Sequence, residues 1–363
     1  GGMNYYRYLI SAYTNNDIQW EIAEQLNFGV ETKMFGGILE FTLDAFQEIR
    51  HNVIGTRTTL PSSAGVEIAP LDNIGKSRMR GIDFSGKIQH AFSKDLWMIL
   101  NGTLTYSKSV YKEIEEATGK PDWQRMKGQE ISQQIGYIAE GLFRDQAEID
   151  NSKNPDKSQR KYAYVSGAKP GDFRFKDMDG NMEIDENDRT ITGNYMPKFT
   201  YGFSTELKYK WFDLSIALQG VQGNKIANIF RRYIDNMEGG NNCQVDALDR
   251  WQSESNPGSG YVVRANRSAT GMNGTTSTWH IEDGSYMRIK NITFGYTLPK
   301  SLLTNVGISR ARVYFSTQNP FTFTKYSGYN PEVNMKGGSL TPGIDYGTYP
   351  LSKSFVFGLN VTF

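Results

Sequence analysis

Six oxygen-bearing side chains within residues 177–188 form the sharpest chemical motif in the sequence. Acidic or amide oxygens fall at positions 1, 3, 5, 9 and 12 of this stretch, and a further carboxylate stands at position 7. Such spacing allows one turn of chain to wrap a calcium ion. Two positions depart from the calcium-loop pattern, because Met182 replaces the glycine of position 6 and position 12 is Asp instead of Glu. The candidate ligands of a structural calcium ion are Asp177, Asp179, Asn181, Glu183, Asp185 and Asp188. The alternative is a solvated acidic turn held by Asx hydrogen bonds.

Other reactive residue types lack the partners that catalysis needs. Residues 81–88 place Gly and Lys as in a phosphate-binding loop, but no Ser or Thr follows the lysine and the stretch alternates like a strand. The histidines His51, His90 and His280 are scattered, and no HExxH or GxSxG motif is present. Cys243 is the single cysteine, so neither an internal disulfide nor a cysteine zinc site can form. We therefore predict no enzymatic activity, no catalytic residue and no cofactor besides the calcium candidate.

Several aromatic residues stand between polar residues in irregular stretches. Such rings can stack on sugars or pack against a partner, and the alternatives are loop packing or the aromatic girdle of a membrane interface. The candidates are Trp123, Tyr233, Trp251, Tyr261, Trp279 and Tyr346.

The elements that must position these residues have apolar side chains at every second position. At the C-terminus Phe355, Phe357, Leu359, Val361 and Phe363 fall on one face, and mostly polar or small residues fall on the other. This alternation predicts a β-strand with one apolar and one polar side. An all-β fold of about ten strands is predicted, over approximately 18–34, 38–54, 82–92, 96–112, 130–143, 198–210, 212–219, 285–298, 310–316 and 354–363.

The connections between these segments come in two sizes. Short ones carry turn residues, as at Gly36-Gly37, at 93–95 and at Lys210, and long polar ones cover 55–75, 113–129, 144–197, 229–284 and 325–351. Long strands that alternate short turns with long loops are typical of a transmembrane antiparallel β-barrel, with periplasmic turns and extracellular loops. The apolar phase slips by one between Ile289 and Ile292, which predicts a bulge or the membrane boundary.

Charge and hydropathy narrow the classes of protein further. Among 363 residues, 40 basic and 39 acidic side chains give a net charge of +1, without the basic excess of a nucleic-acid-binding protein. No run approaches the roughly 18 apolar residues of a membrane helix. A helical membrane protein is excluded, whereas a membrane barrel is not, because its strands alternate.

Several stretches resemble the SusC/RagA family of TonB-linked outer-membrane proteins from Bacteroidetes. They include residues 136–143, 171–177 with the acidic segment that follows, 193–197, 288–299, 319–321 and 329–332. The closing stretches 343–350 and 355–363 are similar to the C-terminus of that family, with Phe363 as the terminal residue that barrels present to the assembly machinery. The resemblance spans nearly the whole chain in the expected order.

This resemblance implies the C-terminal part of a plugged TonB-dependent barrel of about 22 strands. Residues 1–363 would supply wall strands and two large extracellular loops, 144–197 and 229–284, while the plug and the TonB box would belong to a longer precursor or a companion chain. The implied function is import of a nutrient, an oligosaccharide or a peptide, across the cell outer membrane. The implied partners are a SusD-like surface lipoprotein, the TonB complex acting through the plug, and outer-membrane lipid. The alternative is a soluble or surface-attached all-β glycan-binding module.

Overall fold

The computed structural model describes residues 14–57, 59–60, 69–151, 161–162, 168–237, 240–266, 272–303, 307–333 and 343–363. Its α-helices are short: α1 (Gln146–Asn151), α2 (Phe230–Ile234) and α3 (Lys300–Leu303). Among the described residues, no helix has the length and apolar character required to cross a membrane. Short 3-10 helices cover Phe35–Gly37, Asp122–Gln124, Glu186–Asp188, Val245–Asp249 and Met272–Gly274.

Nine strands form the main sheet of the described chain, in the order β1-β2-β3-β4-β11-β12-β15-β16-β18. This order follows the chain, so each strand lies beside the preceding and following strands of the sheet. The antiparallel all-β prediction is therefore confirmed. The strands are β1 (Ile22–Met34), β2 (Leu39–Thr56), β3 (Leu71–Ala91), β4 (Leu96–Glu113), β11 (Phe199–Tyr209), β12 (Phe212–Gln222), β15 (Tyr286–Thr297), β16 (Arg310–Thr324) and β18 (Ser354–Thr362).

The chain folds as two compact units. The first comprises residues 1–28, 45–81 and 107–131, and the second comprises 29–44, 82–106 and 132–363. Within the first unit, ion pairs join Arg57 to Asp72 at 2.6 Å and Lys108 to Glu130 at 2.9 Å. All features described below lie within the second unit unless stated otherwise.

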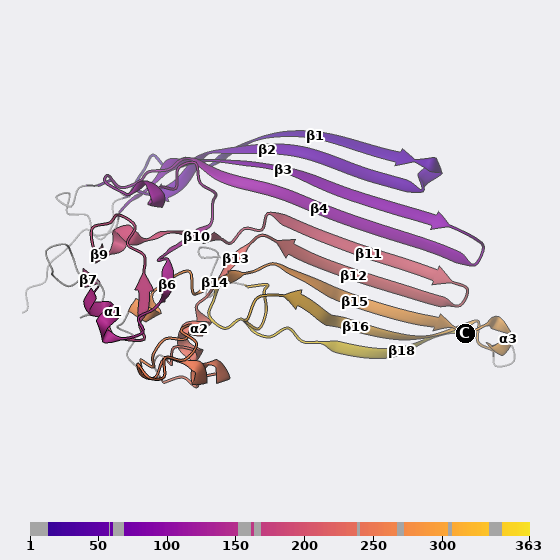
Figure 1. Cartoon of the computed structure of the whole chain (residues 1–363). Coiled ribbons are helices and arrows are strands. Elements are labelled where there is room, and N and C mark those ends of the chain that lie inside the picture. Colours follow the sequence, from indigo (N-terminus) through magenta and orange to yellow (C-terminus); the bar gives the residue numbers. More distant parts are fainter. Residues whose placement is uncertain are drawn as a thin grey trace, which may run out of the picture. The chain divides into compact units, whose positions relative to one another are not determined.

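Apolar side chains of neighbouring strands form continuous rows on one face of the sheet. Phe294 of β15 pairs with Phe315 of β16, which pairs in turn with Phe357 of β18. Phe357 is 80% exposed, and large exposed apolar residues occur on every strand of the sheet. Because the side-chain period is two, the register gathers the predicted apolar face on one surface. Figure 1 shows β11, β12, β15, β16 and β18 side by side.

The opposite face of the same sheet is polar and internally bonded. Asn101 Nδ2 donates to Ser204 Oγ at 3.1 Å, and Thr293 Oγ1 lies 2.8 Å from Ser316 Oγ. Polar residues also line a hollow of about 520 Å³ on β1 to β4. Among them are Glu31, Lys33, Glu40, Lys87 and Thr103. The two faces thus match an outer surface for lipid and an inner surface for water.

Tight turns and one bulge set the strand register. Lys210 adopts a φ of 52° in the turn between β11 and β12, and its N–H donates to the Asp95 carbonyl at 2.8 Å. On β15 the register jumps from Ile289 to Asn291 against β16, and it also shifts against β12. Opposite this jump, β16 carries Pro320, which cannot donate to the ladder. The phase slip predicted near these residues is therefore a bulge.

One predicted strand was wrong. Residues 130–143 do not form a strand of the main sheet. Glu130 makes a single antiparallel bridge to Val110 of β4, and the rest contains two short strands, β5 (Gln133–Gly136) and β6 (Ala139–Leu142). The chain bends where Ser132 and Gly141 take φ values of 68° and 132°. Tyr137 and Phe143 are fully buried, so this apolar segment belongs to a core and not to a half-exposed strand.

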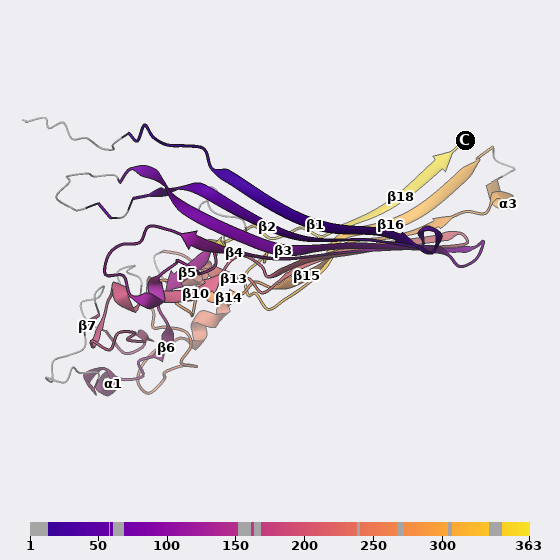
Figure 2. The ribbon, with the colours of Figure 1, turned by 90° about the horizontal axis from the view of Figure 1, so that it is seen from above.

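Described residues of 132–197, 223–285, 325–333 and 343–350 form a folded loop module with small sheets of its own. β5 pairs with β10 (Thr190–Asn194), β6 with β8 (Phe173–Phe175), and β7 (Lys161–Tyr162) with β9 (Glu183–Ile184). β13 (Lys225–Asn228) lies between β14 (Ile281–Asp283) and β17 (Ile344–Asp345). Within the second unit, Figures 1 and 2 place β6, β10 and α1 beyond one end of β15 and β16, and α3 beyond the other.

The loop module has its own hydrophobic core, although its segments are connections between strands. Phe173 and Trp279 pack with ring centroids 5.3 Å apart, and Tyr137 and Phe175 at 5.1 Å. The core residues come from three distant stretches of chain: Tyr137, Leu142, Phe143, Ile149, Phe173, Phe175, Ile184, Val263, Met272 and Trp279.

Candidate functional site

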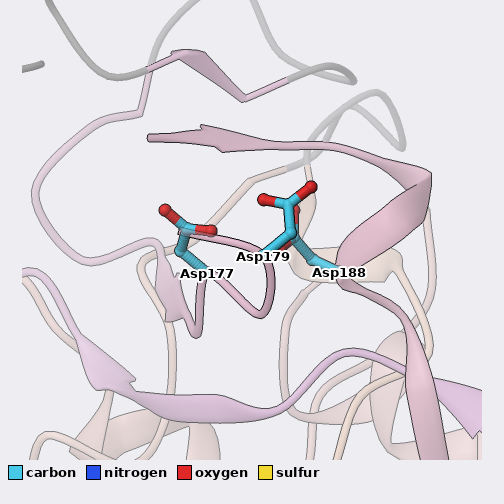
Figure 3. Close-up of side chains that lie close together, drawn as sticks. All are labelled: Asp177, Asp179 and Asp188. Atoms are coloured by element: carbon cyan, nitrogen blue, oxygen red, sulfur yellow. The ribbon is translucent and has the colours of Figure 1, made fainter. Parts of the chain in front are cut away.

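The acidic turn brings three of the six predicted ligands together. Ligand oxygens of Asp177, Asp179 and Asp188 all lie within 4.8 Å of one another. Figure 3 shows these three side chains, which come from the two ends of the loop. Met182, at the position where glycine was expected, adopts a φ of 68°, so the chain makes the sharp left-handed turn without glycine.

Backbone N–H groups orient all three carboxylates, and Asp179 accepts from Asn181 at 3.1 Å. Asp177 accepts from Gly180 and Met182 at 2.7 and 2.8 Å. Asp188 accepts from Met178 at 2.6 Å and from Asp185 at 2.8 Å. Asp188 has no exposed surface, and burial, together with the charges of Asp177 and Asp179, raises the pKa of its carboxyl group. Such a cluster would be stabilised by a cation, so in these three residues the donor set fits calcium.

Of the remaining predicted ligands, Asn181 and Asp185 have local roles in the described structure, and Glu183 is exposed and lies outside the cluster. Asn181 accepts from the Glu183 N–H at 2.6 Å, and its amide donates to Asp179 at 3.0 Å. Asp185 caps the 3-10 helix that begins at Glu186 by accepting from Asn187 at 2.7 Å. These are the Asx contacts of the alternative interpretation, present alongside the carboxylate cluster. The calcium site stays a prediction.

A network of charged and polar side chains anchors segment 326–333 to the polar face of the sheet. Arg288 on β15 is 1% exposed, forms an ion pair with Glu332, and donates to Asn330 Oδ1 at 2.9 Å. Glu332 also accepts from Gln219 at 2.6 Å and from the Tyr286 hydroxyl at 2.8 Å. Burial alone would raise the pKa of Glu332, but Tyr286 and Arg288 hold it below the usual value.

A second buried contact anchors the segment 343–350. The Tyr326 hydroxyl donates to Asp345 Oδ2, and Asp345 Oδ1 accepts from the N–H groups of Gly347 and Thr348, both at 2.7 Å. Burial and Asp345 together raise the pKa of Tyr326, so this hydroxyl stays protonated. Asp345 is thereby fixed beneath an exposed turn.

Alternation did not identify the anchoring residues Tyr326, Asn330, Glu332 and Asp345, because they stand in irregular loops. Asn330, Glu332 and Asp345 fall in the stretches 329–332 and 343–350, which were recognised through the family resemblance.

The loop aromatics divide between the core and the surface. Trp279 is buried in the loop module, where Trp251 packs against the same core, whereas Tyr261 and Tyr346 are exposed. His280 is also buried, and burial together with the nearby Arg231 and Arg232 lowers its pKa to about 3. It is therefore neutral at physiological pH. The Gly81–Ile88 stretch lies within β3, as its alternation indicated.

Phe363 follows β18 and has an exposed side chain. Its carbonyl accepts from Ser309 Oγ at 3.4 Å. The proposed recognition of this residue by the assembly machinery stays a prediction.

Comparison with known proteins agrees with these features. Residues 2–319 match the family model described as "TonB dependent receptor-like, beta-barrel". A "TonB-dependent receptor P3" of Formosa agariphila is 30% identical over 98% of this chain and 35% of its own length. The "TonB-dependent receptor SusC" of Bacteroides thetaiotaomicron is 25% identical over 96% of this chain and 32% of its own length. The chain thus spans about a third of these relatives.

A solved structure shares the fold. "Structure of the RagAB peptide transporter" aligns with a TM-score of 0.71 and 22% identity, over 98% of this chain and 37% of that chain. These relatives are receptors and transporters by name, which supports the prediction of a protein that is not an enzyme. The match favours a membrane barrel over the glycan-binding module. The chain therefore belongs to the TonB-dependent receptor-like β-barrel family, is of the SusC/RagA kind, and lies in the outer membrane.

Proposed function

We propose that this chain forms wall strands and outer loops of a transporter that imports an oligosaccharide or peptide across the outer membrane with energy from TonB. The family match over residues 2–319 carries the proposal. The sheet supports it, because one face is apolar and exposed while the other carries a polar network. These two surfaces suit lipid outside and water inside.

The proposed partners follow from the relatives and the topology. A SusD-like lipoprotein would cover the loop module, since its described segments connect the strands β11, β12, β15, β16 and β18 at one end. TonB would act through a plug supplied by the longer protein or by a companion chain. The acidic turn would hold a structural calcium ion within the loop module and take no part in transport chemistry.

Growth of the native organism on single nutrients tests the proposed function. Deletion of the gene for the full-length protein is expected to abolish growth on one class of oligosaccharide or peptide, and loss of TonB should do the same. Restoring the wild-type gene should restore growth. Unchanged growth of the deletion strain on every such nutrient would contradict the proposal.

Purification from native outer membranes in mild detergent tests the partner. We expect a SusD-like lipoprotein in equal amount, identified by mass spectrometry. A transporter that imports its nutrient but purifies alone would leave the transport proposal standing and remove the lipoprotein from it.

A further inference from the structure

Two aromatic rings from distant parts of the chain meet on the surface of the loop module. Phe230 begins α2, Tyr329 lies in segment 326–333, and their ring centroids are 5.9 Å apart at an angle of 48°. Phe230 is half-buried, whereas Tyr329 is 64% exposed. Burial of a large ring is favourable by about 1.5–3 kcal/mol. An aromatic pair that the fold holds at the surface therefore indicates a surface that binds another molecule.

Polar contacts fix Tyr329 from both sides along the chain. On the N-terminal side, the Ser327 N–H and hydroxyl each donate to Glu282 at 2.8 Å. On the C-terminal side, Asn330 and Glu332 are bound by the buried guanidinium described above. The contacts on both sides therefore hold the backbone at Tyr329 in a fixed position.

Equally specific contacts fix Phe230. The next residue, Arg231, is buried, donates to Asp235 at 2.9 Å, and donates to the Trp279 carbonyl at 3.0 Å. On the other side, a Cβ on Gly347 would lie 3.2 Å from the Phe230 ring. Gly347 also has a φ of 104°, which side chains rarely tolerate, so glycine is required for this close approach.

Three charged residues stand close in sequence to the pair or to Gly347. Arg231, Glu332 and Asp345 are each engaged in ion pairs or hydrogen bonds that are buried or partly buried. The pair therefore offers ring faces and a phenol hydroxyl without an adjacent unpaired charge from these three residues. This chemistry suits a neutral ring that has an apolar C–H face and hydroxyl groups at its edge, as a sugar has.

A peptide is the less suitable ligand for this surface. Extended peptides that bind by strand addition need a free strand edge. In the described structure, β13 precedes Phe230 and is already paired on both edges, with β14 and β17. Two held rings also need little ordering when a ligand binds, which favours affinity.

We propose that Phe230 and Tyr329 form a stacking site for a neutral sugar ring of the imported oligosaccharide. This inference rests on the proposed transport function and specifies its substrate class. Loss of one ring is expected to weaken saccharide binding about tenfold, which corresponds to about 1.4 kcal/mol.

Binding of the full-length transporter in detergent to an array of neutral gluco-, galacto-, manno- and xylo-oligosaccharides tests the site. We expect wild type to bind at least one of them, and Tyr329→Ala and Phe230→Ala to bind it about tenfold more weakly. Tyr349→Ala is the matched control, because Tyr349 is 89% exposed and lies outside the pair. Glu332→Gln keeps both rings but weakens the contacts that hold Tyr329 in place. Its loss of saccharide affinity should lie between those of wild type and the ring variants.

Three results would overturn the inference. The first is normal saccharide binding by both ring variants, and the second is a wild-type protein that binds peptides and none of these saccharides. The third is loss of the lipoprotein from Tyr329→Ala with unchanged saccharide binding, which would make the pair a protein-docking surface. The growth experiment separates these results from failure of the transport proposal, because TonB-dependent growth would persist in each of them.

Discussion

In the main sheet, Phe357 is 80% exposed and continues a row of rings through Phe315 and Phe294, whereas in the loop module Phe143 and Phe175 are almost completely shielded. The same residue type is thus stabilised in two ways. The loop module buries its rings against other parts of the chain, as a water-soluble domain does. The sheet satisfies its backbone with strand pairing and leaves its apolar face to lipid. The loops of this barrel are therefore folded structures and not simple connections.

The largest effect is expected from truncating a core ring of the loop module. Phe143→Ala removes a fully buried side chain, so it should cost about 3–5 kcal/mol of local stability. Hydrogen exchange of the full-length protein in detergent should become faster in residues 132–151 and 272–283. Amides of β16 and β18 should keep their wild-type protection. An equal increase in the exchange rates of these strands would show that the sheet and the loop module unfold together.

The converse experiment introduces a charge into the sheet. Phe357→Arg should lower the free energy of unfolding by about 2–4 kcal/mol if this position lies near the middle of the bilayer, because its face meets lipid. Asn360→Arg on the same strand is the matched control, since Asn360 lies on the polar face. Unfolding by urea of the full-length protein in lipid vesicles measures the free energy of unfolding of both variants. A greater decrease for Asn360→Arg than for Phe357→Arg would reverse the assignment of the two faces.

Acid should release the loop module from the polar face at segment 326–333. The folded pKa of Glu332 lies below its ordinary value of 4.5, so its carboxylate stabilises the folded arrangement above about that pH. This contribution should disappear as the pH falls through the lower folded value. Hydrogen exchange of residues 326–333, corrected for the intrinsic rate, should accelerate over that range.

Glu332→Gln provides the control for the acid experiment. The variant should already exchange faster at neutral pH, and it should lack this acid transition. A transition of wild-type size in the variant would assign the pH dependence to another group.

The smallest and most local effect concerns calcium. Addition of Ca²⁺ to the full-length protein should slow exchange of residues 177–188 and leave the sheet unchanged, because the carboxylate cluster lies within one turn. Asp188→Asn should abolish the response. If Ca²⁺ does not alter wild-type exchange there, the segment is a solvated acidic turn.

Strand periodicity predicted the sheet well, because a two-residue repeat marks each exposed apolar face. It located all nine strands and the slip near Lys290. It did not predict the full length of β3, which starts at Leu71 within a segment interpreted as a loop. It also misassigned 130–143, where apolar residues are buried by the later segments 173–184 and 263–279. The Tyr137 N–H also donates to the Thr276 carbonyl, more than 100 positions away.

The candidate sites were predictable to different degrees. The spacing of carboxylates located the acidic turn, but it could not show which three would converge or that Met182 would replace glycine in a left-handed turn. The Phe230–Tyr329 pair had no signal in the sequence, because its two rings are brought together only by tertiary contacts. Loop composition alone does not specify such contacts.

The parallel pairing of β13 with β17 has a consequence for the order of events during biogenesis. Ala227 and Asn228 find their partners in Ile344 and Asp345, more than 100 residues later in the chain. The outer surface that would meet a nutrient is therefore completed only when almost all of this chain has been delivered to the membrane. A product truncated before β17 could pair its early strands but would lack the completed loop module.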